Sequence, residues 1–203
     1  MTYVLVRIYT GGSDRSVDDL LHLVGQELAP RVIKAGCKRY STVKFADGRI
    51  GSSSFYEDSA AAKRGSEIAA EWVGATGAMK DYKLARTISG EAVYVFQGDH
   101  NAQAKDGEIR LYQTSASRED VAAALTEEAQ PILKSTKGLI RYTCFKLDGA
   151  QGYGAITGHV DRESSTQLSE KAREARQKSG SRLQRVLPQS PEVLQGTIVH
   201  SYT

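Results

Sequence analysis

Val6-Arg7-Ile8-Tyr9, in the first strand-like stretch of the chain, has a close match in Ile109-Arg110-Leu111-Tyr112. Both segments read apolar-Arg-apolar-Tyr, and they are 103 residues apart (109 minus 6). Self-similarity over a fixed distance is the sequence signature of a repeated structural unit. The chain is therefore expected to contain each of its structural elements twice.

A helix start signal follows each of these strands. Ser16-x-x-Asp19 and Ser117-x-x-Asp120 place a hydroxyl that can cap free N–H groups before an acid that favours the positive end of a helix. Apolar residues at helical spacing follow both signals. Proline cannot continue a helix without losing a hydrogen bond, so Pro30 and Pro131 are predicted to mark the helix ends.

The rest of each half repeats in the same order. Gly36-Cys37-Lys38-Arg39-Tyr40-Ser41 and Gly138-Leu139-Ile140-Arg141-Tyr142-Thr143 share the pattern Gly-x-x-Arg-Tyr-Ser/Thr. Asp-Gly pairs, which suit hairpin turns, follow in both halves, and an acid then opens a second helix in each. These paired signals are Asp47-Gly48 and Asp148-Gly149 for the turns, Asp58 and Asp161 for the helices, and 90–96 and 196–202 for the last strands.

The predicted fold class is α+β, with two ferredoxin-like βαββαβ repeats. We expect the first repeat at 1–97, a polar linker at 98–106 and the second repeat at 107–203. A βαββαβ unit carries both helices on one face of its sheet, so its other face needs a cover. The second repeat can supply it, and we expect the two to pack sheet-to-sheet as an intrachain α+β barrel.

Composition narrows the function. The formal charge of +3 gives no electrostatic case for nucleic acid or an anionic membrane surface as a partner. Two cysteines are too few for a disulfide scaffold, and no spacing indicates a metal site. No signal peptide or membrane span is recognisable. We expect a cytoplasmic protein, either a monomer with an intrachain pseudo-dimer or a homodimer of it.

Side chains alternate along a strand, which predicts the lining of the barrel. Val4, Val6 and Ile8 are expected to face the helices, while Arg7 and Tyr9 face the opposite sheet, as do Arg110 and Tyr112 in the second half. The last strand of each half is expected to pair with the first strand. It would then present Tyr94 and Phe96 in one half and His200 and Tyr202 in the other.

Such an interior suits a flat, partly aromatic molecule that carries a carboxylate, phenolate or enolate. The expected substrate-binding residues are Arg7, Tyr9, Tyr94, Tyr112, His159 and Tyr202. His159, in the register of Tyr56, either faces the cavity or caps its strand. The alternative is that Arg7 and Arg110 pair with inward acids such as Glu108 and form a polar core without a ligand. Because Arg39 and Arg141 give their strands polar groups on both faces, those strands are expected at sheet edges.

With the repeat, the Gly-x-x-Arg-Tyr pattern, Phe55-Tyr56-Glu57-Asp58 and Ala70-Glu71-Trp72-Val73 in view, each half resembles the antibiotic-biosynthesis-monooxygenase-like group of the dimeric α+β barrel superfamily. The resemblance covers nearly the whole chain. That group includes cofactor-independent oxygenases of quinols and polyketide-like aromatics, haem-degrading enzymes and proteins without a known activity. The haem-degrading branch uses an Asn on the first strand and a His after the Trp. Here the first strand carries Arg7, and no His follows Trp72 before His100, so we expect neither haem degradation nor any cofactor or metal.

The resemblance implies a cofactor-independent monooxygenase, in which an electron-rich aromatic loses a phenolic proton and the anion reduces O₂. A His base and an Arg that holds the anion fit this chemistry. We expect His200 and Arg110 to be the catalytic pair. Because Tyr94 stands in the place of His200 in the first half, this interpretation puts the active site in the second half. The competing hypotheses are a non-catalytic small-molecule-binding or stress-related protein of the same fold, and a barrel whose surface docks a partner protein.

Overall fold

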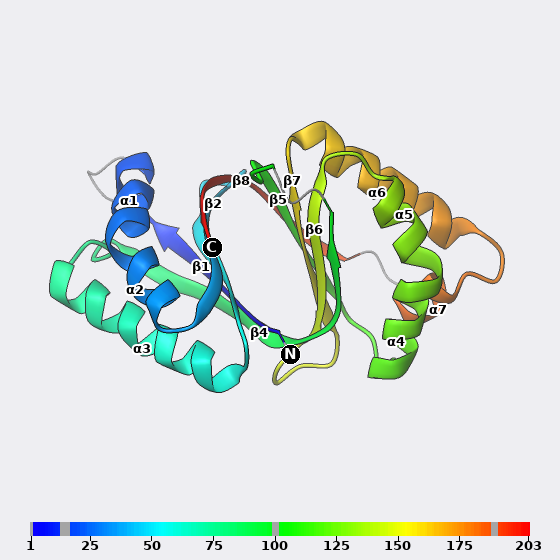
Figure 1. Ribbon diagram of the computed structural model, residues 1–203, viewed down its shortest axis with the longest axis horizontal. Helices are drawn as coiled ribbons and strands as arrows, with labels where there is room; N and C mark the ends of the chain where they lie inside the picture. Colours follow the sequence, from blue (N-terminus) through cyan, green and yellow to red (C-terminus); the bar gives the residue numbers. More distant parts are fainter. Residues whose placement is uncertain (1, 13–16, 99–101, 188–190) are drawn as a thin grey trace. The chain divides into compact units, whose positions relative to one another are not determined.

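The computed structural model describes residues 2–12, 17–98, 102–187 and 191–203 (Figure 1). Two compact units make up the chain. Unit 1 consists of Met1–Glu91 and Gly196–Thr203, and unit 2 is Ala92–Gln195. The predicted Ser16 cap and His100 lie outside the described residues. No helix among the described residues is long and apolar enough to cross a membrane.

Unit 1 contains a five-stranded antiparallel sheet in the order β4-β1-β3-β2-β8, with its helices on one face (Figure 1). Its elements are β1 (Tyr3–Gly11), α1 (Val17–Leu23), η1 (Val24–Leu28), α2 (Ala29–Lys34), β2 (Cys37–Phe45), β3 (Ile50–Tyr56), α3 (Ser59–Thr76), the first part of β4 (Tyr82–Gln97) and the last part of β8 (Glu192–Tyr202).

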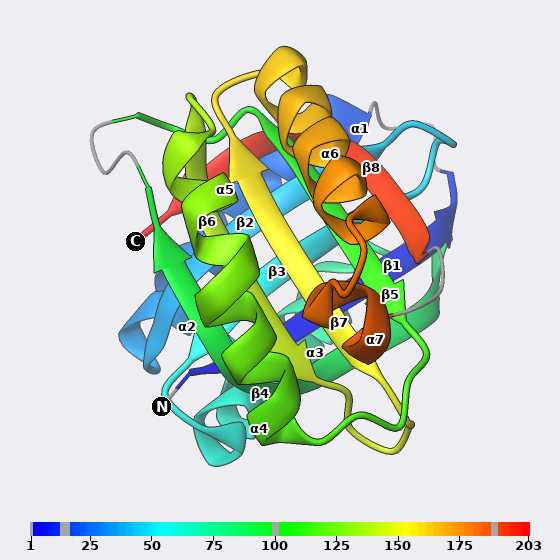
Figure 2. The ribbon, with the colours of Figure 1, turned by 90° about the vertical axis from the view of Figure 1, so that its right-hand side faces the viewer.

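Unit 2 repeats this element order and adds one short helix. Figure 2 shows α5, α6 and α7 over its strands. Its elements are the rest of β4, β5 (Asp106–Tyr112), α4 (Arg118–Ala124), η2 (Leu125–Ala129), α5 (Gln130–Ser135), β6 (Leu139–Lys146), β7 (Tyr153–His159), α6 (Arg162–Gln177), α7 (Arg182–Val186) and the start of β8.

The fold is therefore mixed α+β, and the eight strands are hydrogen-bonded in the closed order β1-β3-β2-β8-β5-β7-β6-β4 that defines a barrel. This confirms the fold class at that level. The sheet-to-sheet packing of two repeats, their common origin by duplication and the boundaries at 97 and 107 stay predictions.

The strands β4 and β8 are longer than predicted, and each takes part in both units. β4 pairs with β1 along 82–91 and with β6 along 92–97. Tyr94 therefore belongs to unit 2, where it pairs with Cys144. His200 and Tyr202 belong to unit 1, where they pair with Thr42 and Tyr40 of β2. The prediction that the last strand of each half pairs with the first strand is confirmed, because β4 pairs with β1 and β8 with β5. However, Tyr94 and His200 lie on the parts of β4 and β8 that pair with β6 and β2, so the prediction that they belong to the sheet of their own half is wrong.

The first helix of each unit continues through its proline. A π-helical segment, η1 or η2, precedes an α-helical turn that has Pro30 or Pro131 near its first position. The prediction that the prolines end these helices is wrong. A wide π turn interrupts the α-helical hydrogen-bond ladder, so the missing proline N–H falls at a helix start, where it needs no partner.

The cap and turn signals are confirmed where the structure describes them. Asp58 accepts a hydrogen bond from the Ala61 N–H at 2.8 Å, and Asp161 and Ser117 cap their helices in the same way. Gly48 and Gly149 have positive φ, as Asp-Gly turns require. The edge-strand prediction is wrong, because β2 pairs with β3 and β8, and β6 pairs with β4 and β7.

Candidate functional site

The arginines of the first strands face the helices. Arg7 Nη2 donates to Ser66 Oγ of α3 at 2.5 Å, and Arg110 Nη2 donates to Ser169 Oγ of α6 at 2.6 Å. Ser66 and Ser169 are 103 residues apart, as the two arginines are. Side chains alternate along these strands as predicted, but the two faces were assigned the wrong way round. The residues Arg7, Tyr9, Arg110 and Tyr112 lie on the helix side of their sheets, not on the side that faces the opposite sheet.

The assignment of the two faces was wrong because both faces of these strands are buried. Val4, Val6 and Ile8 are at most 1 % exposed on the face of β1 that points away from the helices. Leu5, on the helix face, belongs to the core under those helices. When both faces bury apolar residues, hydrophobicity cannot tell which face meets the helices.

A pocket of about 350 Å³ lies in unit 1 between the sheet and the helices, a volume typical of small-molecule sites. Its lining combines apolar walls with aromatic and hydroxyl groups. It consists of Arg7, Tyr9, Leu21, Val24, Leu28, Tyr40, Thr42, Ile50, Gly51, Ser52, Ser66, Ala69, Ala70, Trp72, Val73, Met79, Tyr82 and Leu84.

Two hydroxyls on this lining are buried without a hydrogen-bond partner in the structure: Thr42 Oγ1 and Tyr82 Oη. Thr42 is 1 % exposed and Tyr82 is 9 % exposed. Leaving a buried hydroxyl unpaired costs about 1–3 kcal/mol. Both groups are therefore suited to contact a polar ligand in the pocket.

Tyr9 and Tyr40 are neutral hydrogen-bond donors in the pocket rather than bases. Burial raises the pKa of Tyr9 above its ordinary value of 10.0. Burial also raises the pKa of Tyr40, even though the neighbouring Ser52 hydroxyl lowers it. At neutral pH, Arg7 is thus a cation among uncharged donors, an arrangement that stabilises a bound anion.

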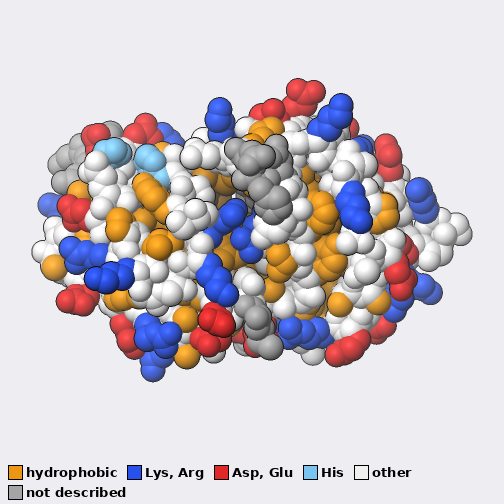
Figure 3. Space-filling view, in the orientation of Figure 1, with side chains coloured by type: hydrophobic (Ala, Val, Ile, Leu, Met, Phe, Trp, Pro, Cys, Tyr) orange, Lys and Arg blue, Asp and Glu red, His pale blue; other side chains and the backbone are white. Residues whose placement is uncertain are grey.

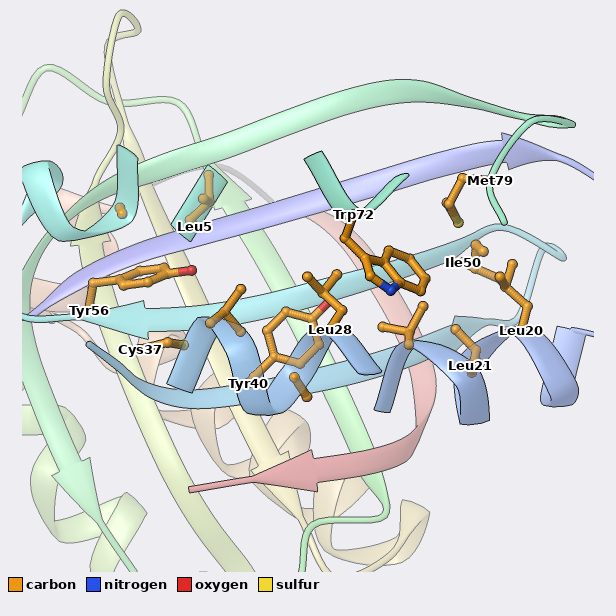
Figure 4. Packing of buried hydrophobic residues seen from close by; sticks show 14 of the residues in the cluster. Leu5, Leu20, Leu21, Leu28, Cys37, Tyr40, Ile50, Tyr56, Trp72 and Met79 are labelled. Carbon is orange, nitrogen blue, oxygen red and sulfur yellow. The ribbon is translucent and has the colours of Figure 1, made fainter. Parts of the chain in front are cut away.

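Trp72 forms one wall of the pocket. Its indole, from α3, lies among Leu21, Leu28 and Ile50 and toward Tyr40 (Figure 4). The indole Nε1 donates to Glu27 Oε2 of η1 at 2.9 Å, which fixes the orientation of the ring. Trp72 is 1 % exposed, so it belongs to the buried core of unit 1 as well as to the pocket wall.

The equivalent space in unit 2 measures only about 30 Å³. Leu183 of α7 and Leu187 after it fill the space together with Arg176, whose Nη2 donates to Tyr112 Oη at 2.7 Å. Glu128 holds α7 in place, because its carboxylate accepts from the Arg182 N–H at 2.6 Å and the Leu183 N–H at 3.1 Å.

The charge of Arg110 is balanced inside unit 2. Arg110 Nε forms a salt bridge with Glu108, whose side chain is 5 % exposed. This is the pairing that the ligand-free alternative expected. In unit 1, Leu5 stands 103 residues before Glu108, so that carboxylate has no counterpart at the corresponding position beside Arg7. Unit 1 therefore contains both the open pocket and Arg7, an arginine without the neighbouring carboxylate that Arg110 has in unit 2.

The remaining predicted site residues are dispersed. Although β8 and β5 are paired, His200 lies on the part of β8 that pairs with β2 in unit 1, and Arg110 lies in unit 2. The premise that they are neighbours within one half is therefore wrong. Tyr94 packs edge-on against Tyr142. His159 is buried in unit 2, and burial, followed by the charge of Arg110, lowers its pKa to about 4. The catalytic and binding roles assigned to these residues stay predictions.

Sequence reasoning missed several pocket residues. Thr42, Ser52, Met79 and Tyr82 belong to none of the motifs that the sequence analysis used. Ser66 could have been found, because it repeats as Ser169 at the same offset of 103 residues as the two arginines. Among the residues that the structure describes, no three His, Cys, Asp or Glu side chains are close enough to hold a metal ion.

The fold and this pocket define an α+β protein with a pocket between sheet and helices in unit 1. Similar solved structures include a "putative monooxygenase" from Lactobacillus acidophilus NCFM, with 9% identity, a TM-score of 0.64 and coverage of 100% of this chain and 96% of that one. An anthrone oxidase-like protein has 9% identity and a TM-score of 0.61, covering 99% of this chain and 92% of that one.

A chlorite dismutase from Candidatus Nitrospira defluvii, solved as the W145F mutant with cyanide, has 11% identity and a TM-score of 0.64, covering 97% of this chain and 90% of that one. Likeness at such identities shows that these proteins and this chain share a fold. Neither a family model nor a curated protein sequence matches the chain.

Proposed function

We propose that this protein is a cofactor-independent oxygenase that binds a small phenolic or enolic aromatic molecule in the pocket of unit 1. The observation that carries the proposal is the pocket of about 350 Å³ with Arg7 on its floor and Trp72 and Tyr40 on its walls. The names of two structural neighbours, a monooxygenase and an anthrone oxidase-like protein, support this choice of chemistry.

The pocket residues suit the anion that such a reaction needs. Arg7 offers a charge-assisted hydrogen bond to a phenolate or enolate oxygen, which favours loss of the substrate proton. The uncharged phenols and the two unpartnered hydroxyls can donate to the same anion or to a second oxygen. Electron transfer from the substrate anion to O₂ then begins the oxidation. For an anthrone, the balanced reaction consumes one O₂ and yields the quinone and one water.

The test is oxygen uptake with a panel of anthrones and quinols, each compared with an anaerobic incubation. Arg7→Met is expected to lower kcat/KM about 100-fold, the usual effect of removing one donor to a developing oxyanion. The matched control is the double variant Arg110→Met with Glu108→Leu, which removes the corresponding arginine of unit 2 without leaving a buried carboxylate alone. Equal losses in the two variants, or no turnover by the wild type across the panel, would contradict the proposal.

A second candidate is a non-catalytic protein that binds the same ligands. It is favoured because the described residues lining the pocket include no histidine and no carboxylate that could act as a base. Trp72 is the only tryptophan of the chain, so quenching of its fluorescence reports occupancy of the pocket directly. Saturable quenching without oxygen uptake would establish this second function.

A further inference from the structure

A row of polar side chains crosses the unit 1 sheet from the pocket toward the molecular surface. Arg7 pairs with Ser52, Ser52 pairs with Thr42, and Thr42 pairs with His200. Directly paired residues on antiparallel strands share one face and have Cβ atoms about 4.5–5.5 Å apart. Arg7 contacts α3 on this face, so the whole row lies under the helices.

The far end of the row reaches the surface. His200 is half-buried, and its ring lies 5.7 Å from the ring of His22 on α1. Figure 3 shows histidine side chains next to each other on this face of the molecule. Arg7, Ser52 and Thr42 line the pocket, whereas His200 does not. Thr42 is thus the residue between the pocket and the imidazole.

Thr42 has the properties of a connecting group. Its hydroxyl is buried and has no partner in the structure, although it lies between two polar neighbours in the row. Side chains do meet across β2 and β8 at this register: on the opposite face, Ser41 Oγ and Ser201 Oγ of the adjacent pair are 3.0 Å apart. A rotation about the Thr42 side chain, or one water, would join its hydroxyl to His200.

We propose that His200 receives the proton of a phenolic ligand through the hydroxyl of Thr42. The inference rests on the proposed function, because it needs a phenol bound at Arg7. The phenol O–H bond breaks as Thr42 Oγ1 accepts that proton, and the proton of Thr42 passes to the unprotonated ring nitrogen of His200. The products are a bound phenolate and an imidazolium, and no electron is transferred. His200 keeps the proton while the phenolate is bound and passes it to solvent, to which it is partly exposed, only after the phenolate has reacted or left.

This assignment gives the pocket the base that its own lining lacks. Arg7 stabilises the phenolate, and the half-buried imidazole of His200 supplies a ring nitrogen that can accept a proton. The ring neighbours of His200 are His22 on α1 and Tyr202 on β8. The same elements β2 and α1 also carry the exposed Lys44–Asp18 ion pair. In this role Thr42 and His200 act from the edge of the pocket, and Arg7 acts inside it.

The experiment counts protons when 2-naphthol, a flat phenol that O₂ need not oxidise, binds to the intact protein at pH 8. Calorimetry in buffers of different ionisation enthalpy measures proton release, and naphtholate absorbance measures ionisation of the bound probe. The wild type is expected to bind naphtholate and release almost no proton, because His200 keeps it. In His200→Gln and Thr42→Val, naphtholate is not expected to bind without proton release. Either 2-naphthol binds in its neutral form, or about one proton is released to solvent for each naphtholate bound.

Two variants make the result specific. Thr42→Ser keeps the hydroxyl and is expected to behave like the wild type, so a merely structural effect of Thr42→Val is recognised. His22→Gln removes the exposed neighbouring imidazole and is also expected to bind like the wild type. For any anthrone or quinol that is turned over, His200→Gln should lower kcat/KM about 100-fold, whereas His22→Gln should leave it unchanged.

The outcomes separate the two proposals. Binding of neutral 2-naphthol by the wild type, release of a full proton with bound naphtholate, or identical behaviour of His200→Gln would overturn the proton route while leaving the pocket in place. Absence of any binding by the wild type would overturn the proposed function and the proton route together. Proton retention without oxygen uptake from any substrate would support the route and refute only the oxygenase activity.

Discussion

Leu183→Ala is predicted to destabilise unit 2 strongly, because this side chain fills the space that is open in unit 1. Leu183 is 4 % exposed. Together with Arg110 and Tyr142 it lines the small void of about 30 Å³ that remains in unit 2. Its helix, α7, is short and is held at its start by the Glu128 carboxylate. That anchor keeps α7 from moving far into the space that a smaller side chain would leave.

The magnitude follows from the atoms removed. Three buried carbon groups are worth about 0.8 kcal/mol each, and unrelaxed space adds about 24 cal/mol per Å³. The void already present shows that α7 does not collapse fully onto the sheet, so part of the new cavity remains. We expect a loss of about 3 kcal/mol in the free energy of unfolding, and a decrease in Tm of about 6–12 °C for a chain of this size.

Urea denaturation followed by circular dichroism measures this loss, while Trp72 fluorescence follows unit 1 in the same experiment. A difference between the two probes is expected if the units unfold separately. Val193→Ala is the control, because Val193 is 49 % exposed and its truncation should change stability by less than about 0.5 kcal/mol. A loss below about 1 kcal/mol in Leu183→Ala would refute the view that α7 is a tightly packed filler of unit 2.

Three further predictions concern other packed groups. Burial lowers the pKa of His159 from 6.5 to about 4, so between these pH values the unfolded chain binds a proton that the folded chain does not. The free energy of unfolding should therefore fall by about 3 kcal/mol as the pH is lowered from 6.5 to 4. Urea denaturation at a series of pH values measures this loss, and His159→Phe should lack it. A Cβ at Gly25 would collide with the Tyr202 hydroxyl, so Gly25→Ala should cost about 2 kcal/mol in thermal unfolding and Tyr202→Leu should restore most of it. Glu27→Ala leaves the Trp72 indole N–H without its acceptor, and we expect a shift of the fluorescence maximum and a loss of about 1 kcal/mol in urea denaturation.

Local signals were sufficient for much of the fold. The Asp58 and Asp161 caps and the two Asp-Gly turns depend only on residues a few positions apart, and the structure confirms them. The π-helical segments before Pro30 and Pro131 could not be predicted in this way. A proline ends an α-helix in most contexts, and the wide turn that accommodates it here leaves no distinctive residue pattern.

The site was harder to predict because it depends on which strand face meets the helices and on how far each strand extends. Val4, Val6 and Ile8 looked like a helix-facing set, yet Arg7 faces the helices. The extra length of β4 and β8 moved Tyr94 and His200 into the other unit. Strand pairing between residues far apart in sequence decides both features, and no short-range pattern encodes it.

Differences at corresponding positions explain why the pocket occurs in unit 1 although several of its residues occur in both units. Arg7, Tyr9, Tyr40 and Ser66 have counterparts in Arg110, Tyr112, Tyr142 and Ser169. The divergent positions, 103 residues apart, are Leu5 and Glu108, Trp72 and Ala175, and Val73 and Arg176.

Each of these differences favours an open pocket in unit 1 and a closed one in unit 2. Glu108 neutralises Arg110, and Arg176 occupies the space over Tyr112. Ala175 provides no aromatic wall, and α7 supplies leucines in place of a ligand. Retained residues alone therefore do not locate a site, because an arginine and two tyrosines can equally well form a closed polar core. The position of His200 on β8 adds an imidazole to unit 1, beside the pocket that remained open, which is why we assign function to unit 1 rather than to unit 2.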